Sequence, residues 1–162
     1  MPKYFGTDGI RGKSPEWLDI NKAYRIGYAI GKEFSPEKVY IGRDTRASGF
    51  KLNQGLNQGL IDSGVKPINL GVVSTPMTQY LSLKNNCMGI MITASHNPAT
   101  DNGIKILFSG KKSTESQEAL IESYLDDENL KASHLGNFTL DERPIVDYLE
   151  AIKSLGFPKT DI

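Results

Sequence analysis

Short β-branched segments alternate with longer amphipathic segments along this chain of 162 residues, and this order restricts the possible fold more than any other feature. Residues 39–41, 68–70 and 89–92 each form a short apolar run that leads into a polar loop, and residues 103–108 form a further strand candidate. Strands separated by helical segments are typical of an α/β layer fold. The pattern therefore predicts a three-layer α/β/α sandwich around a mainly parallel, possibly mixed, sheet.

The segments between these strands carry apolar residues at helical spacing. Asp19 is a candidate N-cap for the first of them, and Gly64 is a candidate end of the second. Thr75, directly before Pro76, predicts a hydroxyl cap and a helix start, and Thr114 with Gln117 matches a capping box. Apolar spacing predicts helices within residues 20–34, 52–60, 75–81, 114–125 and 144–155.

A polar and partly acidic stretch from 126 to 140 interrupts the alternation and is the best candidate for a linker. We therefore expect a first domain at residues 1–135. Residues 136–162 are then a linker and the first helix of a second domain that this chain does not complete. In the alternative interpretation, the helix at 144–155 folds back on the first domain.

Composition excludes several classes of partner. Nineteen basic residues balance nineteen acidic ones, so no net field attracts nucleic acid or an anionic membrane. The longest apolar run, residues 88–92, is far shorter than the roughly 20 residues that span a bilayer. Cys87 is the single cysteine and cannot form an internal disulfide, which favours a reducing, cytoplasmic location.

The stretch Thr93–Pro98 is the strongest candidate for chemistry. Ser95 follows a buried-looking apolar run, His96 is its neighbour, and Lys105 follows within a short distance in sequence. A site that moves a phosphoryl group needs cations fixed around the reacting oxygen. Because ligands gather beyond the carboxyl ends of strands in α/β sheets, the cations expected at loop tips can converge there. These cations are Arg11, Arg43, Arg46, His96 and Lys105.

Four ordered motifs carry a family resemblance. Residues 5–12, 41–46, 93–98 and 101–105 resemble, in order and spacing, the first domain of the α-D-phosphohexomutases. The N-terminal motif is most similar to the phosphoglucosamine mutase branch, with the phosphomannomutase and phosphoglucomutase branches next. Thr93 departs from the first branch, which often has serine there, and is common in the other two.

The resemblance implies a mechanism that interconverts hexose 6-phosphate and hexose 1-phosphate. Ser95 would be a phosphoserine that gives its phosphoryl group to a hexose monophosphate and takes the other phosphate back from the 1,6-bisphosphate intermediate. Lys105 would be the general acid and base, aided by Arg11, and His96 would position or polarise the phosphate. The same four residues would bind the substrate, which is most simply glucosamine phosphate, with mannose or glucose phosphate as alternatives.

The resemblance also implies that the rest of the site lies outside this chain. The family holds Mg²⁺ with alternating aspartates of its second domain, and the sequence contains no Asp-x-Asp-x-Asp. Ser95 would therefore contribute to the metal site only through its phosphate. We expect domains II to IV as partners, a hexose 1,6-bisphosphate as activator, and no turnover by this chain alone.

Three other functions are alternatives to this one. A serine hydrolase needs a Gly-x-Ser-x-Gly elbow, which does not surround Ser95, and the other histidine, His134, lies in the linker candidate. Gly12-Lys13-Ser14 resembles the end of a P-loop, but Thr7 stands where that motif needs glycine. The remaining alternative is a domain that binds phosphate or partner domains without catalysis. For His96, a role in supporting its loop is as consistent with the sequence as a contact with phosphate.

Overall fold

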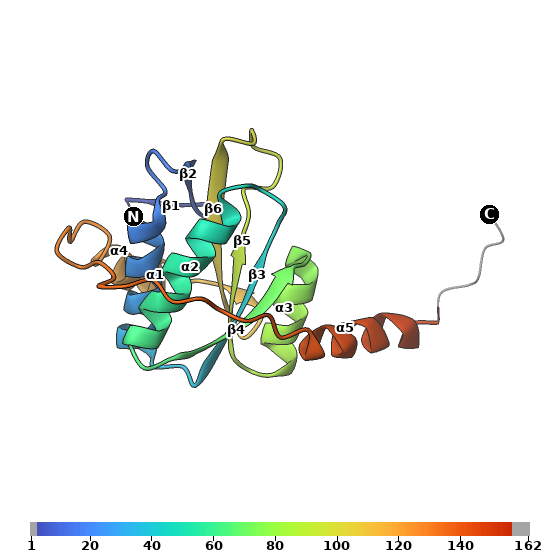
Figure 1. The fold of residues 1–162 in the computed structure, drawn as a ribbon. Helices are drawn as coiled ribbons and strands as arrows, with labels where there is room; N and C mark the ends of the chain where they lie inside the picture. The colour runs from blue at the N-terminus through green and yellow to red at the C-terminus, as the bar shows by residue number, and fades with distance from the viewer. Residues whose placement is uncertain (1–2, 157–162) are drawn as a thin grey trace.

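The computed structural model describes residues 3–156 and places helices on both faces of a seven-stranded mixed sheet (Figure 1). The α/β prediction and its strand candidates are confirmed. The strands run in the order β1-β2-β6-β5-β3-β4, with β7 beside β6. Their bounds are β1 (Phe5–Gly6), β2 (Gly9–Lys13), β3 (Lys38–Arg43), β4 (Lys66–Val72), β5 (Met88–Ile92), β6 (Asp101–Phe108) and β7 (Lys111–Lys112).

The parallel part of the sheet is smaller than the sequence predicts. β3 pairs in parallel with β4 and β5, whereas β6 runs antiparallel to both β5 and β2. The cause is the connection between β5 and β6, which spans only residues 93–100 and contains no helix. A parallel pair needs a crossover of a dozen or more residues, so this short connection can only reverse the chain direction. The turn at residues 93–100 is therefore held between two paired strands.

Five helices occupy the segments with helical spacing, with bounds α1 (Ile20–Phe34), α2 (Gly49–Asp62), α3 (Thr75–Lys84), α4 (Glu115–Glu122) and α5 (Arg143–Ser154). The side chain of Asp19 accepts from the N–H of Lys22, and Thr114 forms its capping box with Gln117. The predicted cap of α3 is wrong by one residue: Ser74 accepts from Met77 N at 3.3 Å, and Thr75 already lies in the helix. Ser74 has the extended backbone that an N-cap requires.

Alternate residues of the strands face two separate cores. Val39 and Ile41 of β3 are fully buried against α1 and α2, whereas Tyr40 between them packs toward Leu81 of α3. This alternation is the two-residue period of a strand buried on both faces. Helices α1 and α2 therefore cover one face of the sheet and α3 covers the other, which confirms the three layers.

The chain after α4 runs along the edge strand β4 before it forms α5. Asp141 N donates to Asn69 O at 2.7 Å, so this segment pairs with the exposed edge of the sheet. Helix α5 touches the body through α3, where the rings of Tyr80 and Tyr148 lie 5.5 Å apart, and it projects from the body in Figure 1. No residue of α5 is buried. The proposed boundary at residue 135 stays a prediction, and residues 157–162 lie outside the described residues.

Within residues 3–156, none of the helices combines the length and the apolar content that crossing a bilayer requires.

Candidate active site

Ser95 lies at the tip of the loop between β5 and β6, with its side chain exposed to solvent. Its backbone is left-handed, with a φ of 56°, a conformation that residues other than glycine seldom adopt. The N–H of Ser95 donates to Thr93 Oγ1 at 3.0 Å, and the N–H of Asn97 donates to Ala94 O at 3.1 Å. The loop therefore turns sharply at Ser95 and presents its hydroxyl outward.

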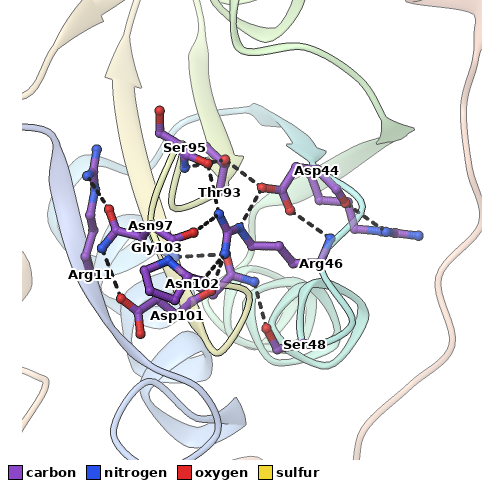
Figure 2. A network of polar contacts seen from close by, with 12 residues as sticks. Arg11, Asp44, Arg46, Ser48, Thr93, Ser95, Asn97, Asp101, Asn102 and Gly103 are labelled. Atoms are coloured by element: carbon purple, nitrogen blue, oxygen red, sulfur yellow. Dashed lines mark hydrogen bonds and ion pairs between the residues drawn. The ribbon is translucent and has the colours of Figure 1, made fainter.

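Arg46 fixes this loop from the side of α2. Its side chain is only 12% exposed, and its guanidinium is surrounded by carbonyl oxygens of the loop in Figure 2. Those oxygens belong to Ser95 (2.9 Å), Asn97 (2.9 Å), Pro98 (2.5 Å) and Asp101 (3.0 Å). An arginine offers five N–H donors in one plane, which suits such a ring of acceptors. The sequence indicated Arg46 only as a cation at a loop tip, and the structure shows it as a support of the Ser95 loop.

Asp44 connects Arg46 to the strand end that precedes Ser95. One carboxylate oxygen of Asp44 accepts from Thr93 Oγ1 at 2.7 Å and from Arg46 Nε at 3.1 Å. The other oxygen accepts from the N–H of Arg46 at 3.0 Å. The hydroxyl of Thr93 thus donates to Asp44 and accepts from the N–H of Ser95. This chain of contacts fixes the strand end and the loop relative to β3.

Gly103 allows three backbone segments to meet below the loop. A Cβ at this position would lie 2.6 Å from Thr93 O and 3.0 Å from Ile10 O, so only glycine fits without movement of the backbone. The neighbouring Asn102 is fully buried and donates to Ser48 Oγ at 2.8 Å. Thr93 N also donates to Gly103 O at 2.9 Å, which joins the end of β5 to β6.

Arg11 and Lys105 lie in neighbouring strands and share one carboxylate. Arg11 is in β2, not at a loop tip as the sequence predicts, and Lys105 is in β6. The register of the two antiparallel strands pairs Arg11 with Gly103, two residues from Lys105. Asp8, in the turn between β1 and β2, accepts through Oδ2 from Arg11 Nη2 at 2.9 Å and from Lys105 Nζ. Asp8 is a functional candidate that the sequence does not single out, although it lies within the N-terminal motif of residues 5–12.

The electrostatic effect of this pair is visible at Asp8. The hydrogen bond from Lys105 is the main cause that lowers the pKa of the Asp8 carboxyl, and the charge of Arg11 acts in the same direction. Partial desolvation opposes the shift without cancelling it. Arg11 Nη1 also donates to Asn97 Oδ1 at 3.3 Å. A single polar network therefore joins Lys105 and Arg11 to the Ser95 loop through Asp8 and Asn97. Figure 2 shows the contact between Arg11 and Asn97.

The remaining candidates are less involved. His96 is exposed next to Ser95, and Arg43 donates to the carbonyl of its neighbour Asp44 at 3.1 Å. His134 lies in the segment after α4, where its ring contacts Ser133 Oγ at 3.3 Å. The P-loop alternative fails because Gly12 and Lys13 end a strand and are followed by turns, whereas α1 begins only at Ile20.

Two cavities adjoin the shared carboxylate. One, of about 300 Å³, is lined by Asp8 and Arg11 among other residues of the β1–β2 hairpin. The other, of about 280 Å³, is lined by Asp8, Lys105 and Thr75. A larger cavity of about 610 Å³ lies between β4 and residues 139–143, on a different element from the Ser95 loop.

The described residues do not form a metal site by themselves. Between residues 3 and 156, no three His, Cys, Asp or Glu side chains are grouped so that they could hold an ion. A hard divalent cation needs several oxygen ligands, so the chemistry of these residues does not fit Mg²⁺ without additional ligands.

Comparison with known proteins assigns the chain to a family. A family model described as phosphoglucomutase/phosphomannomutase, alpha/beta/alpha domain I, matches residues 2–132. Phosphoglucosamine mutases of Bacillus cereus (strain B4264) and Bacillus mycoides (strain KBAB4) are 48% identical over 134 residues, which is 79% of this chain. The match covers 30% of each relative, so the chain spans about a third of their length.

Solved structures show the same fold. A phosphoglucomutase/phosphomannomutase family protein from Burkholderia thailandensis superimposes with a TM-score of 0.76 at 27% identity, over 93% of this chain and 35% of that one. A second structure, from Thermus thermophilus, gives a TM-score of 0.79 at 27% identity, over 96% of this chain and 37% of that one.

Proposed function

Because this chain belongs to the phosphoglucomutase/phosphomannomutase family through its alpha/beta/alpha domain I, we propose that it is the phosphoserine-bearing part of a phosphohexose mutase. The observation that carries the proposal is the loop of Ser95, which exposes the serine side chain and whose Asn97 accepts a hydrogen bond from Arg11. Arg11 and Lys105 both donate to Asp8, so the two cations lie beside this loop. The activity of the whole enzyme depends on further residues, since the relatives are about three times as long.

In the proposed reaction, a hydroxyl of a hexose monophosphate attacks the phosphorus of phosphorylated Ser95. The bond from phosphorus to the sugar oxygen forms while the bond to Ser95 Oγ breaks; Lys105 accepts the proton of the attacking hydroxyl, and Ser95 Oγ takes up a proton as it leaves. In the second step Ser95 Oγ loses its proton and attacks the other phosphoryl group of the 1,6-bisphosphate. The bond from that phosphorus to the sugar oxygen breaks, and Lys105 gives its proton to this sugar oxygen. Arg11 and His96 bind and position the phosphate, since phosphoryl transfer is accelerated mainly by positioning and by charge.

Several finer points rest on the comparisons. We propose glucosamine phosphate as the substrate, because the relatives at 48% identity are phosphoglucosamine mutases. Mannose or glucose phosphate is the second candidate, which the family model favours by its description. Mg²⁺ would contact this chain only through a phosphate on Ser95 and would take its other ligands from domains II to IV. The chain alone is expected to be inactive, and its single cysteine favours the cytoplasm.

Intact mass tests the central step. The mass of the chain is measured before and after incubation with glucose 1,6-bisphosphate in the presence of domains II to IV, and we expect the added mass of one phosphoryl group, mapped to Ser95 by peptide analysis. Ser95→Ala removes this mass, whereas Ser133→Ala, a matched change at an exposed serine, retains it.

A chain that never carries phosphate on Ser95 would support the alternative of a non-catalytic docking domain. Added mass that persists in Ser95→Ala would place the phosphate elsewhere. Sustained turnover by the chain alone would overturn the expectation that further domains complete the site.

A further inference from the structure

Asp8 occupies the position between Arg11 and Lys105 that an anionic ligand would take. A single oxygen, Oδ2, accepts from both cations. The side chains of Arg11 and Lys105 are 28% and 16% exposed, whereas that of Asp8 is 49% exposed. The carboxylate is thus the most exposed member of the group, and its Oδ2 atom lies between the two cations.

The cavities support the same conclusion. Asp8 and its neighbour Gly9 line both the cavity beside Arg11 and the cavity beside Lys105. The Asp8 side chain therefore lies where two spaces of about 300 and 280 Å³ adjoin. If this side chain turns away, an anion gains access to both cations at once.

The backbone around Asp8 allows such a movement of the side chain alone. Gly9 packs closely against β6, since its φ is 97° and an ideal Cβ would lie only 2.4 Å from Ile104 O. Gly6 pairs with Gly9, so Asp8 lies in the tight turn that closes the β1–β2 hairpin. Rotation about the side-chain bonds of Asp8 is therefore sufficient to release Arg11 and Lys105, with no change in the sheet.

We propose that Asp8 is an internal counter-anion that holds Arg11 and Lys105 together until a tetrahedral dianion displaces it. A carboxylate and a phosphate oxygen make the same charge-assisted contacts with arginine and lysine, so the two compete for one position. The proposal rests on the proposed function for its physiological anion, the phosphoryl group of a phosphohexose or of Ser95. Asp8 then favours dianions over monoanions, because only the larger charge outweighs the carboxylate.

Sulfate is a suitable probe, because it stays a dianion at neutral pH. Its binding to the purified chain is measured by NMR titration at low ionic strength. Asp8→Asn removes a negative charge, of the same sign as sulfate, that lies beside both cations. We expect the affinity of this variant for sulfate to rise by about 10-fold. Asp8→Ala gives the same direction, and thermal unfolding confirms that both variants are folded.

The matched control is Asp126→Asn, because Asp126 is also exposed and pairs with another lysine, Lys3, at 2.9 Å. This variant is expected to bind sulfate as the unaltered chain does. The gain in Asp8→Asn is expected to disappear when Lys105→Met is added. Unchanged or weaker sulfate binding in Asp8→Asn overturns the proposal, and so does a gain that survives Lys105→Met.

The test is independent of the test of the proposed function. Sulfate binding does not require the hydroxyl of Ser95, so the gain persists in a chain that carries both Asp8→Asn and Ser95→Ala. A failure of Ser95 phosphorylation would therefore leave this result intact, and a failure of sulfate binding to respond to Asp8 would leave the phosphoserine proposal intact.

Discussion

The guanidinium of Arg46 lies 2.9 Å from the main-chain oxygen of Ser95 and binds the carbonyl oxygens of Asn97, Pro98 and Asp101 at the same time. The left-handed backbone at Ser95 is therefore held by a largely buried cation from another segment, where many turns rely on a glycine. A serine in this conformation costs on the order of 1 kcal/mol or more, and the surrounding contacts must offset that cost. Arg46 is the main source of these contacts.

Arg46→Met is expected to destabilise the chain by about 3 kcal/mol, because it removes the guanidinium that binds four loop carbonyl oxygens and forms an ion pair with Asp44. Urea unfolding measures this loss, and amide hydrogen exchange is expected to accelerate at residues 95–97. Arg46→Lys restores part of the stability, since an ammonium group has three donors in place of five.

Arg43→Met is the matched control for this prediction. The side chain of Arg43 donates to Asp44 O at 3.1 Å, and within residues 3–156 it forms no hydrogen bond with the loop carbonyls that Arg46 binds. Exchange at residues 95–97 is expected to stay unchanged in this variant. Equal loss of loop protection in both variants would show that Arg46 has no special role.

Gly103→Ala is expected to destabilise the fold by about 2–4 kcal/mol, because the new methyl group would lie 2.6 Å from Thr93 O and force backbone segments apart. Gly6→Ala is the control, since the nearest atom to its Cβ is Gly9 O at 3.7 Å, an ordinary contact. Thermal unfolding of the two variants decides the matter. Similar midpoints would show that the close approach at Gly103 is relieved by small movements.

Much of this fold follows from local patterns. The buried strands β3 and β5 are apolar on both faces, and the helices α1 and α2 repeat apolar residues at helical spacing, so each is visible within a short window. The β1–β2 hairpin is different. Only Phe5 and Ile10 mark its buried side, and β2 is completed by β6, which lies about 90 residues further along the chain. Its pairing depends on a register that no local window contains.

The site divides in the same way. The order of residues is sufficient to single out the motif around Ser95, and Arg11 and Lys105 with it, as candidates. The role of Arg46 was not, because its partners are backbone carbonyls, which every residue has and no sequence pattern marks. The bridge formed by Asp8 likewise requires β2 and β6 side by side.

Glu122→Gln is expected to loosen the N-terminal strand. The carboxylate of Glu122 accepts from the backbone N–H groups of Lys3 (2.6 Å), Tyr4 (2.5 Å) and Phe5 (2.7 Å), and thereby ties β1 to α4. Hydrogen bonds to a charged acceptor are stronger than neutral ones, so the loss is expected to be about 1–3 kcal/mol. Amide exchange at residues 3–5 measures the local effect. Glu128→Gln, at an exposed glutamate after α4, is the control, and equal exchange in both variants would contradict the clamp.

The titration of Asp8 tests whether Lys105 and Arg11 bind its carboxylate. Its pKa is lowered from the ordinary value of 3.8, chiefly by the hydrogen bond from Lys105 and further by Arg11. Because the pKa of Asp8 is lower in the folded protein than in the unfolded chain, the ionised carboxylate stabilises the fold at pH values above 3.8. This stabilisation is lost as the pH falls from 3.8 through the pKa of the folded state. Carboxyl ¹³C NMR is expected to show a midpoint below 3.8 for Asp8. Lys105→Met is expected to return it toward 3.8.

Lys3→Met supplies the matched control for this titration. Hydrogen bonds from Tyr4 and then from Lys3 lower the pKa of Asp126, so Lys3→Met is expected to raise the midpoint of Asp126 and leave that of Asp8 unchanged. The opposite pattern is expected for Lys105→Met. A midpoint of Asp8 that responds equally to both substitutions would mean that general charge, and not the contact between Asp8 and Lys105, sets its titration. In that case the carboxylate would not be bound tightly enough to compete with an incoming anion.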